Sequence, residues 1–161
     1  QELGLENNVR MLGMRSDVPE VLAGLDLKVL SSQMEANPAS TLEANACGLP
    51  VVAPKVGSLI DTVEHGVTGL LCKPDDAEAL SQAILEILTK DDRGAGMGLA
   101  ARAKVCREFS LEVMVQGYEN LIEGVYSAAQ CGESLQPKVF DQIMESRLSG
   151  IAAAPPIGSL S

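Results

Sequence analysis

Short apolar segments of the chain alternate with segments in which apolar residues recur at helical spacing. The apolar segments that read as strands are Val9–Leu12, Leu27–Leu30, Pro50–Ala53 and Gly69–Cys72. Segments this short and this uniformly apolar are typical of strands buried on both faces, as in parallel sheets. The alternation therefore predicts βαβ units, and so an α/β fold with a parallel sheet.

Residues that start and stop helices lie between these strands. Ser16 is expected to cap a short helix that ends near Gly24. Ser40 and Glu43 have the spacing of a capping box, in which each side chain bonds the other's backbone N–H, at the start of a helix that Gly48 stops.

Three longer helices are expected after these. The first opens at Asp75 and Glu78, the second spans Asp91–Arg107, and Ser110 caps the third. Two of them carry an apolar stripe that we expect to be buried. The stripes are Leu80, Ile84, Ile87 and Leu88, and then Met114, Tyr118, Leu121, Ile122 and Val125.

The character of the chain changes after Tyr126. We expect a partial Rossmann-like domain over residues 1–126, then a linker with a possible C-terminal helix over residues 127–149. Residues 150–161 are small, uncharged and contain proline, which predicts a disordered tail.

Composition and charge exclude several classes of function. The chain has 161 residues, with 12 basic and 22 acidic ones, and its net charge of −10 disfavours binding to nucleic acid. No apolar run approaches the length of a membrane span. The 4 cysteines form no C-x-x-C pair and there is 1 His, so we expect no metal site and a reduced, cytoplasmic protein.

The main candidate functional residues lie between the second and third expected strands. Glu35 follows a strand end, where ligands bind in open parallel sheets. The helix that begins near Thr41 directs free N–H groups to the same place, which favours a phosphate. From the residues alone, Glu43 serves equally well as half of a capping box, and a residue such as Glu35 is more often a solvated loop charge.

The segment E-A-N-P-A-S-T-L-E-A-N-A-C-G-L-P-V-V-A resembles the E-x7-E segment of retaining glycosyltransferases with the GT-B fold (glycosyltransferase group 1, family 4). The surroundings agree: V-R-M-L-G precedes it, V-G-S-L-I-D-T-V-E-H-G-V-T-G-L-L follows it, and P-D-D-A-E-A-L-S-Q-A-I and F-S-L-E-V-M-V-Q-G-Y-E-N-L come later. The resemblance covers roughly Leu5–Tyr126, far more than a lone motif.

The resemblance implies roles for individual residues. The first Glu of the family's motif holds hydroxyls of the donor sugar, which implies this catalytic role for Glu35, and the second binds the ribose, which implies that role for Glu43. Backbone amides after the first Glu receive sugar and diphosphate, and the turn after the first strand lies near the base. These donor-binding positions correspond to Asn37, Ala39 and Ser40, and to Met14 and Arg15.

The chain departs from the family's pattern at two places. Ala36 stands where Gly usually follows the first Glu, and a positive φ there would cost an alanine about 1 kcal/mol. Gly57, Ser58 and Asp61 stand where the family has a pair of glycines and a following Glu. The family's reaction implies neither a metal nor a cofactor.

The resemblance implies the donor-binding C-terminal part of an enzyme that moves a hexose from a nucleoside diphosphate sugar to an acceptor with retention. The acceptor domain and two central strands would precede Gln1, so the chain alone is expected to be inactive. It is also expected to be marginally stable or self-associating, which size-exclusion chromatography with thermal unfolding tests. One alternative is a non-catalytic nucleotide-sugar-binding or interaction module. Another, a flavodoxin-like signalling domain, would need an acidic cluster that Met11–Ser16 does not offer.

Overall fold

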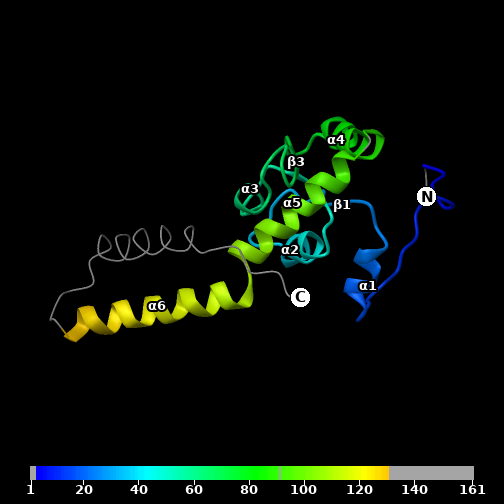
Figure 1. Cartoon of the computed structure of the whole chain (residues 1–161). Coiled ribbons are helices and arrows are strands. Elements are labelled where there is room, and N and C mark those ends of the chain that lie inside the picture. Colours follow the sequence, from blue (N-terminus) through cyan, green and yellow to red (C-terminus); the bar gives the residue numbers. More distant parts are fainter. Residues whose placement is uncertain (1–2, 91, 131–161) are drawn as a thin grey trace. The chain divides into compact units, whose positions relative to one another are not determined.

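The computed structural model describes residues 3–90 and 92–130, and shows an α/β protein (Figure 1). Its 3-stranded parallel sheet has the order β1-β2-β3, with β1 at Lys28–Val29, β2 at Val51–Pro54 and β3 at Gly69–Cys72. In register, Lys28 lies opposite Val51, and Val51 lies opposite Gly69. The expected parallel α/β fold is confirmed.

The chain divides into two compact units, Gln1–Glu108 and Phe109–Ser161. In the first unit, one helix precedes the first strand, two connect successive parallel strands, and two follow the last strand. These helices are α1 (Val18–Ala23), α2 (Ala39–Ala46), α3 (Leu59–Thr62), α4 (Ala77–Thr89) and α5 (Arg93–Glu108). The described part of the second unit is built around α6 (Leu111–Gln130).

Strand β2 is buried along its whole length and supplies side chains to two apolar clusters. Val51 and Ala53 join a cluster that includes Ala44 of α2 and Leu59 of α3. Val52 joins the other, with Leu70 of β3, Ile87 of α4 and Met97 of α5. Alternate residues of a strand point to opposite faces, so this division shows that helices cover both faces of the sheet.

Helices α2 and α5 approach each other through glycine. A Cβ on Gly98 of α5 would lie 1.9 Å from the carbonyl oxygen of Gly48, which follows α2. Gly48 itself has a φ of +80°, as a residue just after a helix often does. No side chain fits at Gly98, so this contact depends on the backbone alone.

The strand expected at Val9–Leu12 is wrong. This segment has no regular secondary structure, and Met11 is 90% exposed. A strand is stable only beside a neighbour with which it can exchange backbone hydrogen bonds. Within residues 3–90 and 92–130, no sheet partner for this segment is present.

Two expected helix starts are also wrong. Asp17, not Ser16, is the N-cap of α1, and its side chain makes no capping bond because it binds Arg15. The capping box fails because α2 begins at Ala39 with Pro38 as its N-cap, which places Ser40 and Glu43 inside the helix. Proline at position 38 disfavours the helical conformation for the residue before it, which is consistent with a helix that begins just after Pro38.

The N-cap of α4 is Asp76 rather than Asp75, and its Oδ1 accepts a hydrogen bond from the Ala79 amide at 2.9 Å. In the second unit, Ser110 caps α6 as expected, since the Val113 amide donates to its Oγ at 3.3 Å.

The apolar stripe of α6 differs from the prediction. Three of its members are exposed rather than buried: Met114, Tyr118 and Ile122. Leu88 of the expected α4 stripe is also exposed, whereas Ile87 is buried. Helix α6 continues through Gln130, beyond the boundary expected after Tyr126. Residues 131–149, which hold most of the expected linker and C-terminal helix, and the tail over residues 150–161 lie outside the described residues. No helix in the described ranges is long and apolar enough to cross a membrane.

Candidate functional site

The candidate site lies where the parallel strands end at their carboxyl side. The loop after β1 carries Glu35 and leads into α2, the loop after β2 carries Gly57, and the turn after β3 carries Asp75. Carboxyl ends of parallel strands meet at one edge of the sheet, which is where open α/β sheets bind their ligands. Two contacts join these loops, one through Gly57 and one through Asp75.

Glu35 is half-buried, and its carboxylate has no hydrogen-bond or ion-pair partner among the described residues. The main chain of Glu35, by contrast, lies in close contact with Gly57, since a Cβ on Gly57 would lie 1.6 Å from the Glu35 carbonyl oxygen. The backbone is therefore held while both carboxylate oxygens remain available. Such a group can accept hydrogen bonds from hydroxyls of a ligand.

The first turn of α2 follows Glu35 closely. Asn37 and Ala39 are exposed and Ser40 is half-buried, so ligands can reach this end of the helix. Amides in a helix's first turn have no acceptor inside the helix, and the helix dipole adds partial positive charge there. This arrangement favours an anion such as a diphosphate.

Glu43 lies in the middle of α2 and is exposed. In the part of the chain that the structure describes, its side chain has no partner. The reciprocal bond with Ser40 that a capping box requires is absent, because no side chain caps α2. The structural alternative for Glu43 is thus removed, and a ligand-binding role remains open to it.

Met14 and Arg15 lie in the segment that precedes α1. The Met14 side chain is fully exposed. Arg15 binds both carboxylate oxygens of Asp17, with Nε donating to Oδ1 at 2.7 Å, and this ion pair lowers the pKa of Asp17. Neither residue is joined to the Glu35 loop by a hydrogen bond or ion pair within the described ranges.

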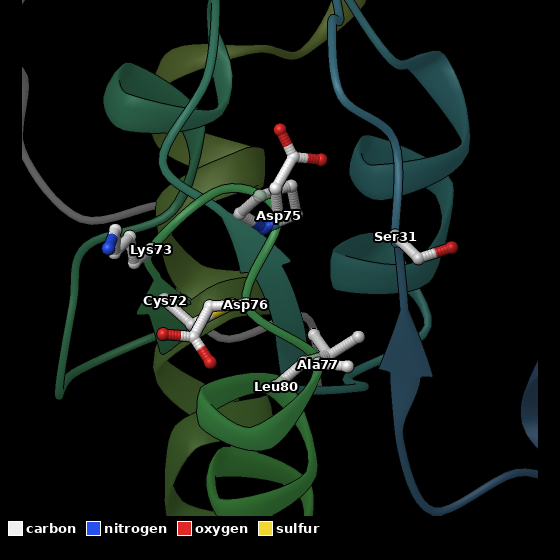
Figure 2. Close-up of a pocket in the computed structure, with 8 residues that line it drawn as sticks. Ser31, Cys72, Lys73, Asp75, Asp76, Ala77 and Leu80 are labelled. Atoms are coloured by element: carbon white, nitrogen blue, oxygen red, sulfur yellow. The ribbon is translucent and has the colours of Figure 1, made fainter.

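A cavity of about 270 Å³ opens beside these loops, at the carboxyl ends of the strands (Figure 2). Figure 2 shows Lys73, Asp75 and Asp76 on the turn between β3 and α4, with Ser31 across from them. Cys72 lines the cavity, its Sγ donates to the Ala53 carbonyl at 3.5 Å, and burial raises its thiol pKa. The expected donor residues do not line it.

The structure adds three residues to the site that the sequence did not indicate. Gly57 contacts Glu35, and the Gln33 Nε2 donates to Asp75 Oδ1 at 2.7 Å. Of the three, only Gly57 could have been linked to the site from the sequence, because it matches one glycine of the family's pattern. Ala36 has no positive φ, since Asp75 and Asp92 are the non-glycine residues with one in the described chain, so the expected strain at Ala36 is absent.

The family model described as "Glycosyl transferases group 1" matches residues 1–104. The chain belongs to the group 1 glycosyltransferases. The expected family is thereby confirmed, together with the α/β architecture that its GT-B relatives share.

Relatives with established names place this group 1 glycosyltransferase among sugar transferases. It is 34% identical over 121 residues to the N-acetyl-alpha-D-glucosaminyl L-malate synthase of Bacillus anthracis, a match that covers 75% of this chain and 32% of the relative. It is 32% identical over 128 residues to a GDP-mannose-dependent phosphatidylinositol monomannoside mannosyltransferase of Corynebacterium glutamicum, covering 74% and 33%. The chain thus spans about a third of the length of these relatives.

The fold of the chain also matches that of solved structures. Anabaena HepE in complex with UDP-glucose matches with a TM-score of 0.68 and 35% identity, over 75% of this chain and 34% of that one. Sucrose-phosphate synthase from Thermosynechococcus elongatus matches with a TM-score of 0.64 and 33% identity, over 67% and 27%. The group 1 glycosyltransferase fold is therefore shared over most of the chain.

Proposed function

We propose that the chain is the donor-binding part of a retaining glycosyltransferase that moves a hexose from a nucleoside diphosphate sugar to an acceptor. The observation that carries this proposal is the placement of Glu35. Its free carboxylate lies at the carboxyl edge of the sheet, just before the open first turn of α2. Solved relatives that contain UDP and glucose support it.

In this proposal the two ends of the donor bind to different parts of the loop and helix. Glu35 accepts hydrogen bonds from the hexose hydroxyls, and Glu43 accepts them from the ribose. The amides near Asn37, Ala39 and Ser40 bind the diphosphate. Met14 lies near the base, and Arg15 contributes its backbone, because its side chain is bound by Asp17.

The reaction breaks the bond between the anomeric carbon and the diphosphate, and forms a bond from that carbon to an acceptor hydroxyl. Negative charge grows on the leaving diphosphate as the bond breaks. Amides and a helix dipole that already point at this position stabilise the charge without reorganising, which lowers the barrier. We propose no metal or cofactor for this step, and we propose the cytoplasm as its location.

A first prediction is that the chain alone transfers no sugar. It spans about a third of its relatives, and the proposed donor residues include no group that would bind an acceptor. The purified chain is incubated with UDP- and GDP-sugars and candidate acceptors, and turnover is measured by release of the nucleoside diphosphate. The complete protein that contains the chain serves as the positive control. Product formed by the chain alone would contradict the prediction.

Binding separates this proposal from a non-catalytic module. In the complete protein, titration calorimetry with nucleotide-sugars should show binding that Glu35→Ala weakens. Glu64→Ala is the control, because it removes the same side chain from an exposed position that precedes β3, at the opposite edge of the sheet. Binding without turnover by the complete protein would favour the alternative of a binding or interaction module. Absence of any binding would overturn both.

A further inference from the structure

The main chain of Glu35 rests directly on Gly57. Gly57 has a φ of +50°, and a Cβ there would lie 1.6 Å from the Glu35 carbonyl oxygen and 2.8 Å from its carbonyl carbon. Real Cβ atoms essentially never approach another heavy atom closer than 3.0 Å, so both distances are too short and the first is far too short. The positive φ also disfavours every residue that carries a side chain. Glycine is thus required at position 57 for two independent reasons, and one of them is the position of Glu35.

A second contact holds the same loop two residues earlier. The Gln33 Nε2 donates to Asp75 Oδ1 at 2.7 Å, across 42 positions of sequence. Asp75 has a φ of +56°, in the left-handed region that Asp adopts more readily than most residues with a side chain. The next residue, Asp76, caps α4 through the Ala79 amide, so Asp75 is attached to the first turn of a 13-residue helix.

We infer that Gly57, Gln33 and Asp75 are positioning residues for Glu35, an inference that rests on the proposed function. The Glu35 carboxylate has no partner of its own among the described residues, so its place is determined by the backbone beneath it. Gly57 supports that backbone from the loop after β2, and the Gln33–Asp75 bond supports it from the turn after β3. None of the three needs to touch the donor.

The inference predicts that Gly57→Ala lowers kcat/KM for a nucleotide-sugar about 100-fold in the complete enzyme. A displacement of about 1 Å at a reacting group has effects of this size. The matched control is Gly66→Ala, because Gly66 also has a positive φ, +85°, but a Cβ there has nothing within 4 Å. The Gly66→Ala variant places an alanine at a positive φ, as Gly57→Ala does, but it disturbs no contact with Glu35. It should therefore change kcat/KM by less than about threefold.

A second pair of variants tests the inference even if Gly57→Ala fails to fold. Asp75→Ala removes the acceptor of the Gln33 bond and should lower kcat/KM about threefold to tenfold, the size of one hydrogen bond. Asp75→Asn keeps an Oδ1 acceptor at the same place and should restore activity to within about twofold of the parent enzyme. A role of Asp75 in charge alone predicts the opposite, with Asp75→Asn as defective as Asp75→Ala.

The deciding measurement compares the binding of the complete donor, UDP-glucose, with the binding of its nucleotide part, UDP. Gly57→Ala should weaken the proposed Glu35 contact with the sugar, so it should affect UDP-glucose binding more than UDP binding. A loss shared equally by both ligands would indicate a general structural defect and would overturn the inference. Hydrogen exchange of residues 31–38 should rise in Gly57→Ala and not in Gly66→Ala; equal exchange in the two variants would also overturn it.

These measurements distinguish a failure of the proposed function from a failure of the positioning role. If the parent enzyme binds and transfers no sugar from any nucleotide donor, the proposed function is wrong, while the exchange data still report whether Gly57 holds the loop. If the parent enzyme is active and Gly57→Ala behaves like Gly66→Ala, the proposed function stands and the positioning role is wrong.

Discussion

Glu35→Ala should lower kcat/KM of the complete enzyme by about 10²- to 10³-fold, the loss seen when one preorganised group at a reacting centre is removed. Glu43→Ala should lower it only about tenfold, with most of the change in KM. The difference follows from the proposed roles: Glu35 contacts the sugar as charge develops on it, whereas Glu43 holds the ribose equally in the ground and transition states.

Steady-state kinetics on the two variants measures both parameters. Glu64→Ala is the control for removal of an exposed carboxylate outside the site, and should match the parent enzyme. A larger kcat defect in Glu43→Ala than in Glu35→Ala would show that the two roles have been assigned the wrong way round.

Two glycines in the first turns of α5 should respond in opposite directions to the same substitution. Gly98→Ala should lower the free energy of unfolding by roughly 2–3 kcal/mol, because its Cβ would meet the Gly48 carbonyl oxygen at 1.9 Å and force α2 and α5 apart. Gly96→Ala should raise it by about 0.5–1 kcal/mol, because nothing lies within 4 Å of its Cβ and alanine favours the helix.

Denaturant unfolding of the parent chain and both variants, followed by circular dichroism, gives the two changes. Each variant is the other's control, since the chemical change, the helix and the neighbourhood in sequence are the same. Equal stabilisation by both substitutions would show that α2 and α5 do not approach through Gly98.

The sequence by itself determined the features that depend on local pattern. Short apolar runs predicted β2 and β3 closely, because a strand buried on both faces needs apolar residues at successive positions. Ser110 was identified as a cap because capping depends on residues within one turn. The resemblance around Glu35 identified the family, because a long ordered set of motifs is specific.

Two predictions failed because a feature outside the matched residues decides the outcome. Val9–Leu12 has strand-like residues but no neighbour to pair with in the described sheet. Ser40 and Glu43 have the spacing of a capping box, yet Pro38 starts α2 earlier and places both inside it. The first prediction failed for want of a pairing strand, and the second because a nearby proline outweighed the capping-box spacing.

The tertiary structure alone decided how Glu35 is held. Gly57 and Asp75 belong to loops that follow other strands, and Gln33 reaches Asp75 across 42 positions. No spacing rule connects such residues, because their proximity comes from the parallel pairing of β1, β2 and β3, which brings the three loops to one edge of the sheet. The sequence could name the carboxylate, but the packing of backbone against backbone at Gly57 determines where that carboxylate lies.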